Sequence, residues 1–252
     1  MAGEEEERLK KRFAELSQKA YRQGVYQYTG FLGLGEQAVF HQVETWLAGV
    51  PWELFGGHAA CERVMARFGD AGMIGYEEAF PIACLEIRPA APKFAEKLGH
   101  RDYLGALLNL GIERSVLGDL FVGEKAYVYV QAAMASFICG NLERVKHTAV
   151  VCRPVEAAPP EALPRRQERL VNAASERLDV VAAAVYNLSR SQCAELFRAG
   201  RVFIDGRLCE NVSAQPKEGA IVSVRGYGRF VYGGVAHTTK KGRFAVRVEL
   251  YQ

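Results

Sequence analysis

The stretch "NLSRSQCAELFRAGRVFIDG" (187–206) holds the signals for a helix and for both of its ends. Ser189 followed three residues later by Gln192 is a capping box, so it predicts a helix that begins at Arg190. Gly200 is the residue best able to adopt the left-handed conformation that follows many helices, so it predicts where this helix stops. The stretch therefore predicts one short helix with two well-defined ends.

A short strand and a hairpin follow this helix, with arginines along the way. The run "VFI" is typical of a strand, and Asp205-Gly206 is a strong signal for a type I′ turn. Arg190, Arg198 and Arg201 are spaced along the stretch with almost no acid nearby. Because a helix N-terminus offers free N–H groups and a partial positive charge, the start of the helix favours a phosphate group.

The positive charge of the chain is confined to its last third. The 252 residues carry a net charge of +3, but residues 165–252 contain 15 Lys/Arg and 8 Asp/Glu, a balance of +7. Residues 1–164 contain 17 and 21, a balance of −4. This asymmetry is typical of a polyanion-binding module joined to other domains. A solubilising surface with no partner is the alternative, and charge alone leaves both open.

Targeting and metal signals are absent from the sequence. The N-terminal run "MAGEEEERLKKRF" has no apolar core of a signal peptide, and the longest apolar run, 180–186, is too short to span a bilayer. No two of the six cysteines have the spacing of a metal knuckle or a redox motif, which indicates buried, reduced thiols. We therefore expect a cytoplasmic, monomeric protein with no metal, no cofactor and no membrane partner.

Hydrophobic periodicity divides the chain into three parts and predicts an α+β fold. Residues 1–73 show helical spacing and predict an N-terminal helical domain. Residues 74–155 have the order βαββαβ, with strands at 81–88, 117–122, 126–131 and 148–155 and helices at 93–111 and 133–145. This order predicts a ferredoxin-like sandwich, the architecture of RNA-recognition motifs. A proline-rich linker at 156–168 leads to a domain at 169–252 with two short helices and a small sheet.

Two tyrosines on the third strand of the central domain are candidates for RNA contacts. Tyr127 and Tyr129 share one face of this strand, and Val128 and Val130 share the other. If the valines pack on the helices, the tyrosines lie on the open sheet, where such domains stack bases. Cross-strand aromatic packing is the structural alternative.

The C-terminal third resembles the S-four domain, a small RNA-binding fold first named for a ribosomal protein. The resemblance rests on "RLD", on "SRSQCAELFRAGRVFIDG" and on the later "KEGAIVSVRG". Cys193 stands where alanine is usual, and Ala220 stands where an acid is commoner. The resemblance implies RNA contacts in the helices and the turns. The expected contact residues are Arg177, Ser189, Arg190, Ser191, Arg198, Arg201, Lys217 and Arg225.

The central part is similar to the bacterial YlmH family. The residues that carry this similarity are "APKFAEKLGHRDYLGALLNLGIERSVLGDLFV" (91–122) and "FGGHAACER" (55–63). The family implies a ribosome-associated RNA-binding protein that is linked to cell division and to the rescue of large subunits carrying stalled peptidyl-tRNA. The implied partners are the ribosome, its large-subunit rRNA and, as a further partner, tRNA.

Two other classes of function compete with this interpretation: an RNA-modifying enzyme of the pseudouridine-synthase kind and a cell-division adaptor. The sequence contains no P-loop, no HExxH and no paired CxxC, so it predicts no catalytic residues. His100, Arg101 and Asp102 form a polar cluster on a predicted helix. We interpret His100 and Arg101 as secondary RNA contacts, because adjacent polar residues on a helix rarely converge on one point. The affinity of an adaptor for its protein partner would change little with salt concentration, whereas RNA binding weakens steeply as salt rises.

Overall fold

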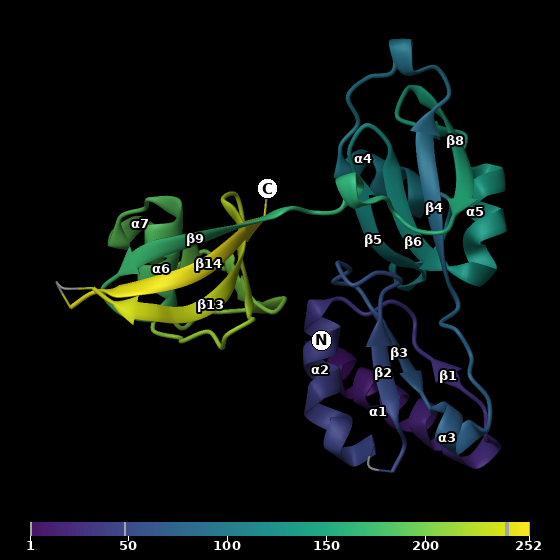
Figure 1. The fold of residues 1–252 in the computed structure, drawn as a ribbon, viewed down its shortest axis with the longest axis horizontal. Helices are drawn as coiled ribbons and strands as arrows, with labels where there is room; N and C mark the ends of the chain where they lie inside the picture. Colours follow the sequence, from purple (N-terminus) through teal and green to yellow (C-terminus); the bar gives the residue numbers. More distant parts are fainter. Residues whose placement is uncertain (1, 48, 240–241, 252) are drawn as a thin grey trace. The chain divides into compact units, whose positions relative to one another are not determined.

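The computed structural model describes residues 2–47, 49–239 and 242–251, and the chain forms two compact units. Unit 1 comprises Met1–Leu163 and unit 2 comprises Pro164–Gln252. Both units combine helices with antiparallel sheets (Figure 1), which confirms the predicted α+β class.

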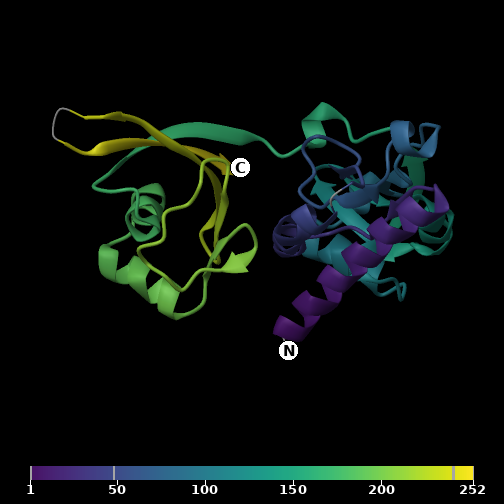
Figure 2. The same cartoon turned by 90° about the horizontal axis from the view of Figure 1, so that it is seen from below.

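The first 73 residues are not purely helical, and that part of the prediction is wrong. A three-stranded sheet with the order β1-β3-β2 packs with the helices of this segment. Its strands have only two or four residues, which is too short for a clear period. The elements are α1 Ala2–Gln23, β1 Gln27–Tyr28, α2 Leu34–Val43, η1 Glu44–Leu47, β2 Trp52–Phe55, β3 Met65–Phe68 and α3 Ala71–Ile74. Figure 2 shows α1 as a long helix, and its Phe13 packs edge-on against Phe40 at 5.1 Å between ring centroids.

The central part of unit 1 has the predicted ferredoxin-like topology. Its sheet has the order β5-β6-β4-β8-β7, and all neighbouring strands are antiparallel. Without β7, which adds two residues beside β8, this is the βαββαβ arrangement. The elements are β4 Ile82–Pro89, η2 Pro92–Phe94, α4 His100–Leu108, η3 Arg114–Val116, β5 Leu117–Val122, β6 Ala126–Gln131, η4 Ala132–Met134, α5 Ala135–Asn141, β7 Arg144–Val145, β8 Thr148–Val155 and η5 Pro160–Ala162.

Both central helices are shorter than the sequence predicts. α4 begins only at His100, because Gly99 is its N-cap and the Asp102 carboxylate accepts a hydrogen bond from the Gly99 N–H at 2.8 Å. The residues between Pro92 and Gly99 form a single 3₁₀ turn and irregular backbone. α5 ends at Asn141, and the residues predicted to continue it form β7.

Unit 2 packs two helices on one face of a six-stranded sheet with the order β11-β10-β12-β13-β14-β9 (Figures 1 and 2). The elements are β9 Arg166–Ala173, α6 Leu178–Tyr186, α7 Arg190–Arg198, β10 Val202–Ile204, β11 Arg207–Leu208, β12 Ile221–Val224, β13 Gly228–Thr238 and β14 Phe244–Tyr251. Apolar side chains of both helices and of the sheet form one core: Leu178, Val181, Cys193, Phe197, Val202, Phe230 and Val246.

Strand β9 corrects the predicted linker at 156–168. β9 pairs with β14 from Arg166 to Ala173, so the first strand of unit 2 is hydrogen-bonded to its last strand. At the other end of the predicted linker, Ala158 is buried in unit 1, and 160–162 form η5. Regular or buried structure therefore occupies both ends of the proline-rich stretch.

The tyrosine face of the central sheet is covered, so the expectation of an open face is wrong. Val128 and Val130 pack on the helices, as assumed, and Tyr127 and Tyr129 lie on the other face. Tyr129 is only 2% exposed and Tyr127 only 8%, because Phe31 and Met65 of the N-terminal segment and Ala158 pack against them. Neither ring has a free face on which a base could stack.

Hydrogen bonds fix the N-terminal segment to β5. The Asp119 carboxylate accepts the N–H groups of Glu62 and Arg63 at 2.5 and 2.8 Å. The Arg63 guanidinium donates to the carbonyls of Leu117 and Phe31 at 2.9 and 2.8 Å. Burial raises the pKa of the Asp119 carboxyl, and the two N–H donors oppose this rise. The segment is thus held by charged groups that are themselves largely withdrawn from water.

A buried carboxylate lies on the same sheet face, closer to the β5–β6 hairpin. Glu86 is 3% exposed, and its carboxylate accepts hydrogen bonds from Lys125 at 2.8 Å, Arg153 at 2.9 Å and the Tyr127 hydroxyl at 3.2 Å. The Arg88 guanidinium lies 3.9 Å away. Burial alone would raise the pKa of Glu86, but the three donors outweigh it and lower the pKa to about 2.

The depressed pKa makes Glu86 a source of pH-dependent stability. Its contribution is fully present above the carboxyl pKa of the unfolded chain and is lost as the pH falls through the folded value of about 2. The shift corresponds to about 3 kcal/mol. We expect Glu86→Gln to lower the free energy of unfolding at pH 7 and to reduce its decline between pH 5 and 2. Both tryptophans, Trp46 and Trp52, lie in unit 1, so their fluorescence during urea unfolding reports on this unit. Parallel pH profiles for the two proteins would contradict this role.

Candidate nucleic-acid interface

Helix α7 has both of the ends predicted from the sequence. Gln192 N–H donates to the Ser189 hydroxyl at 3.2 Å, and the Gln192 side chain accepts the Ser189 N–H at 2.9 Å. At the other end Gly200 has φ +63°, and the N–H groups of Gly200 and Arg201 donate to the carbonyls of Phe197 and Leu196. These bonds form a Schellman motif. The capping box and the glycine stop are confirmed, and they fix where the flanking arginines leave the backbone.

The hairpin that follows is also of the predicted type. Asp205 and Gly206 have φ values of 47° and 75°, as the two central residues of a type I′ turn require. The Asp205 carboxylate accepts the N–H of Ile221 at 2.8 Å, which ties the β10–β11 hairpin to β12. Strand β10, which directly follows Arg201, therefore pairs with a strand on each side.

The N-terminus of α7 presents a positive charge and two hydroxyls. Ser189, Arg190 and Ser191 are exposed, and the two serine hydroxyls are 3.0 Å apart. Among the residues that the structure describes, Arg190 has no carboxylate partner. The helix start thus combines a free guanidinium with the partial positive charge of the helix.

Three arginines gather where α7, β10 and β12 meet: Arg198, Arg201 and Arg225. We call them the arginine cluster. Arg198 ends α7, and the Arg225 N–H donates to the Arg201 carbonyl at 2.8 Å. The Arg225 guanidinium stacks on the Phe203 ring at 4.3 Å, and the Arg201 guanidinium lies against Gly226. All three side chains are exposed, and none has an ion-pair partner within the described part of the chain.

Two predicted residues stand apart from this arrangement. Arg177 forms a two-pronged ion pair with Asp179, at 3.0 and 2.9 Å, and this pairing raises the pKa of the guanidinium. Asp179 is only 7% exposed, so it compensates the charge of Arg177 at close range. Lys217 is exposed in the loop before β12. Lys217 precedes the start of β12, which lies beside the Asp205 hairpin at the end of β10. The arginine cluster lies near the beginning of β10, so Lys217 and the cluster lie toward opposite ends of this strand.

Sequence reasoning missed an aromatic side chain beside the cluster. Tyr227 is 46% exposed, and its ring lies 5.7 Å from that of Tyr186 at the end of α6. Gly226 and Gly228 flank it with φ values of +91° and +137°. The signal was present in "RGYGR", since an aromatic residue between two glycines and two arginines is typical of an exposed turn. Such a ring offers a stacking surface for a base.

The secondary contacts in unit 1 do not form one site. His100 is exposed and lines a hollow of about 850 Å³, together with Arg88 and Lys125. Arg101 is also exposed but lines a different hollow, of about 550 Å³, with Arg144. The structure therefore separates His100 from Arg101, and it buries Tyr127 and Tyr129 as described above.

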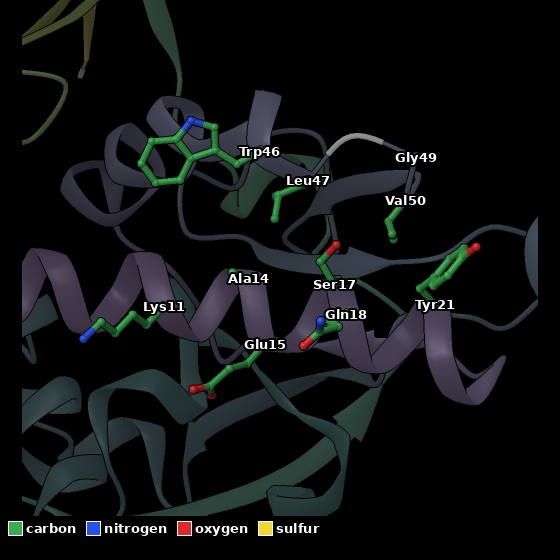
Figure 3. A pocket seen from close by; sticks show the side chains of 10 residues that line it. All are labelled: Lys11, Ala14, Glu15, Ser17, Gln18, Tyr21, Trp46, Leu47, Gly49 and Val50. Carbon is green, nitrogen blue, oxygen red and sulfur yellow. The ribbon is translucent and has the colours of Figure 1, made fainter.

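A further hollow lies between α1 and η1 (Figure 3). Its volume is about 650 Å³, and it is flanked by Trp46, which is 72% exposed, and Tyr21, which is 69% exposed. Lys11 and Glu15 are its only charged lining residues within the described chain, so the lining has no net charge. Its electrostatics do not favour a polyanion.

Within the described residues, the chain offers no further chemical centre. They contain no group of three or more His, Cys, Asp or Glu side chains that could hold a metal ion. The six cysteines are free thiols, and burial raises the pKa of Cys193 to about 11. None of the helices described is long and apolar enough to cross a bilayer.

Ser189 is both a helix cap and a predicted RNA contact, and substitution can separate the two roles. We expect Ser189→Ala to lower the stability of α7 by about 1 kcal/mol, because the Gln192 N–H loses its acceptor. Ser189→Asp retains an acceptor and the stability, but places a carboxylate beside Arg190 and so weakens RNA binding. Hydrogen exchange of the α7 amides measures the first effect, and RNA titration measures the second. Unchanged exchange in Ser189→Ala would show that the cap does not fix the helix start.

Comparisons with known proteins find similar families for two parts of the chain. Residues 76–158 match the putative RNA-binding domain in YlmH, and residues 176–222 match the S4 domain. The chain is 29% identical over 226 residues to the ribosome-associated protein quality control protein P2 of Bacillus subtilis (strain 168), covering 88% of this chain and 86% of that protein. A solved structure, the cell division protein ylmH from Streptococcus pneumoniae, aligns with a TM-score of 0.49 and 18% identity, over 60% of this chain and 91% of that chain. The chain thus matches the RNA-binding domain in YlmH in its central part and the S4 domain in its C-terminal part, and it is similar along most of its length to a ribosome-associated quality control protein.

Proposed function

We propose that this protein binds the large ribosomal subunit through its rRNA, with tRNA as a neighbouring contact, and that it acts in ribosome quality control. The observation that carries the proposal is the distribution of unpaired arginines around α7. Arg190 lies at the N-terminus of this helix, and the arginine cluster lies at its other end. The name of the Bacillus subtilis relative supplies the ribosome and the quality-control role.

The geometry of α7 suits a phosphate backbone better than a single small anion. α7 has nine residues, so Arg190 and Arg198 at its two ends are separated by eight steps of about 1.5 Å, or about 12 Å along the helix axis. Arg190 and Arg198 would therefore contact different phosphates. Such contacts position RNA without reading its sequence, whereas Tyr227 adds a surface for base stacking beside Arg225. The predicted contact of Ser191 extends the same surface, whereas Lys217, toward the other end of β10, would contact a separate part of the RNA.

Arg177 has a different role in this proposal from the other arginines. Its guanidinium is held by Asp179 at the start of α6, so we assign it to the stability of unit 2 and give it a minor share in phosphate binding. Ser189 acts mainly by capping α7.

We further propose that the protein acts by binding and not by catalysis, as a monomer in the cytoplasm. The description of the family that matches residues 76–158 names RNA binding. A cell-division role would be a consequence of ribosome binding, and the proposal does not require a separate adaptor surface. An RNA-modifying activity would need a reactive group beside the bound RNA, and our proposal assigns no residue to it.

The arginines of α7 can be tested through the salt dependence of binding. We expect Arg190→Gln with Arg198→Gln to weaken binding to purified bacterial large subunits and to lower the slope of log K against log[salt] by about 1.4–1.8, since each lost phosphate contact removes about 0.7–0.9. Arg165→Gln with Arg243→Gln is the matched control in the same unit and should change the slope little. Anisotropy of the labelled full-length protein gives both values. A folded double variant with unchanged affinity and slope would refute the assignment.

The identity of the ligand can be tested by sedimentation. In a sucrose gradient at moderate salt, the full-length protein should travel with large subunits, and the Arg190→Gln, Arg198→Gln variant should remain near the top. We expect this difference because contacts between arginines and phosphates supply much of the affinity for RNA. If the wild type stays at the top but binds a free small RNA tightly, the ribosomal assignment fails and the RNA-binding assignment survives.

A further inference from the structure

Three cations surround Glu86 on the part of the central sheet face near the β5–β6 hairpin. Lys125, Arg153 and Arg88 lie 2.8, 2.9 and 3.9 Å from its carboxylate. Arg88 lies on β4, Arg153 on β8 and Lys125 in the turn before β6, and cross-strand pairing places Glu86 directly opposite Arg153. We call Glu86 and these three residues the Glu86 cluster.

The Glu86 cluster has an excess of two positive charges that face solvent. Glu86 is 4% exposed in its side chain, whereas Arg88, Lys125 and Arg153 are 45, 44 and 57% exposed. One buried carboxylate therefore orients three cations without neutralising them. Because their side chains are already ordered, they lose less conformational entropy when they bind an anion.

The surroundings of the cluster give it room for a ligand. Arg88 and Lys125 also line the hollow of about 850 Å³ that contains His100 and Lys97. Two acids, Glu96 and Glu124, complete its charged lining. Glu96 is engaged by the His147 N–H at 3.0 Å, so part of its charge is already satisfied. Val151 borders the cluster, because it pairs with Arg88 and is 41% exposed.

We propose that the Glu86 cluster is a second RNA contact, which binds the phosphate backbone by charge where the buried tyrosines exclude stacking. The proposal rests on the RNA-binding function proposed above and adds a site in unit 1 that is separate from α7. The ligand is an RNA phosphodiester, because several exposed, pre-oriented cations on a sheet suit repeated single charges. An acidic segment of a ribosomal protein is the competing occupant.

Substitution of two of the cations tests the site while Lys125 still pairs with Glu86. We expect Arg88→Gln with Arg153→Gln to weaken binding of the full-length protein to purified large subunits and to lower the salt slope by about 1.4–1.8. Arg88→Lys with Arg153→Lys keeps the charge and should retain most of the slope. Lys19→Gln with Arg22→Gln, two exposed residues of α1, is the matched control in unit 1 and should leave the slope unchanged. Tryptophan fluorescence verifies that each variant is folded.

The outcomes separate this site from the proposed function. If the Arg88, Arg153 variant binds like the wild type while the Arg190, Arg198 variant loses binding, the second site is refuted and the proposed function stands. If neither variant loses binding, both are refuted. A photoreactive diazirine side chain at Val151 identifies the occupant on the large subunit. Transfer of the label to rRNA supports the proposal, and transfer to a ribosomal protein alone overturns it.

Discussion

The N-terminal segment packs on the tyrosine-bearing face of the central sheet, and this packing decides how unit 1 can use that sheet. The Arg63 guanidinium and the Asp119 carboxylate fix the segment to β5, and Phe31 and Met65 then cover Tyr129. A recognition sheet that stacks bases needs exposed rings, and here burial removes them. Around Glu86 the described side chains of Arg88, Lys125 and Arg153 remain exposed, so this part of the face offers charge and not aromatic surface.

In unit 2, hydrogen bonds of the backbone fix the positions from which four flexible arginine side chains extend. Arg190 and Arg198 leave the two ends of a helix that is fixed by a capping box and a Schellman motif. Arg201 precedes β10 and Arg225 follows its neighbour β12, and the Arg225 N–H bond to the Arg201 carbonyl holds the two residues side by side. Local hydrogen bonds thus order the backbone before any ligand binds, and less entropy remains to be lost on association.

The two sites would gain from being in one chain. A small basic surface by itself binds nucleic acid weakly at physiological salt, typically with Kd near 10⁻⁴–10⁻⁶ M. When two such surfaces reach one large RNA, the second contact becomes intramolecular and affinity can rise by about 10²–10⁴. This gain in affinity favours a large RNA particle over a short RNA. Each of the two surfaces carries excess positive charge: residues 165–252 have a balance of +7, and the Glu86 cluster has a local excess of positive charge.

Sequence alone determined what local chemistry controls: the ends of α7, the hairpin at Asp205-Gly206, the βαββαβ order and the basic C-terminal third. Tertiary structure decided the contacts between residues far apart in the chain. Tyr129 is buried by Phe31 and Met65, which come much earlier in the chain, and β9 pairs with the last strand, so neither contact appears in any local pattern. The same holds for Glu86, whose partners come from two other strands. Capping and turn preferences act over three to five residues, whereas burial and ion pairing depend on which distant segments meet.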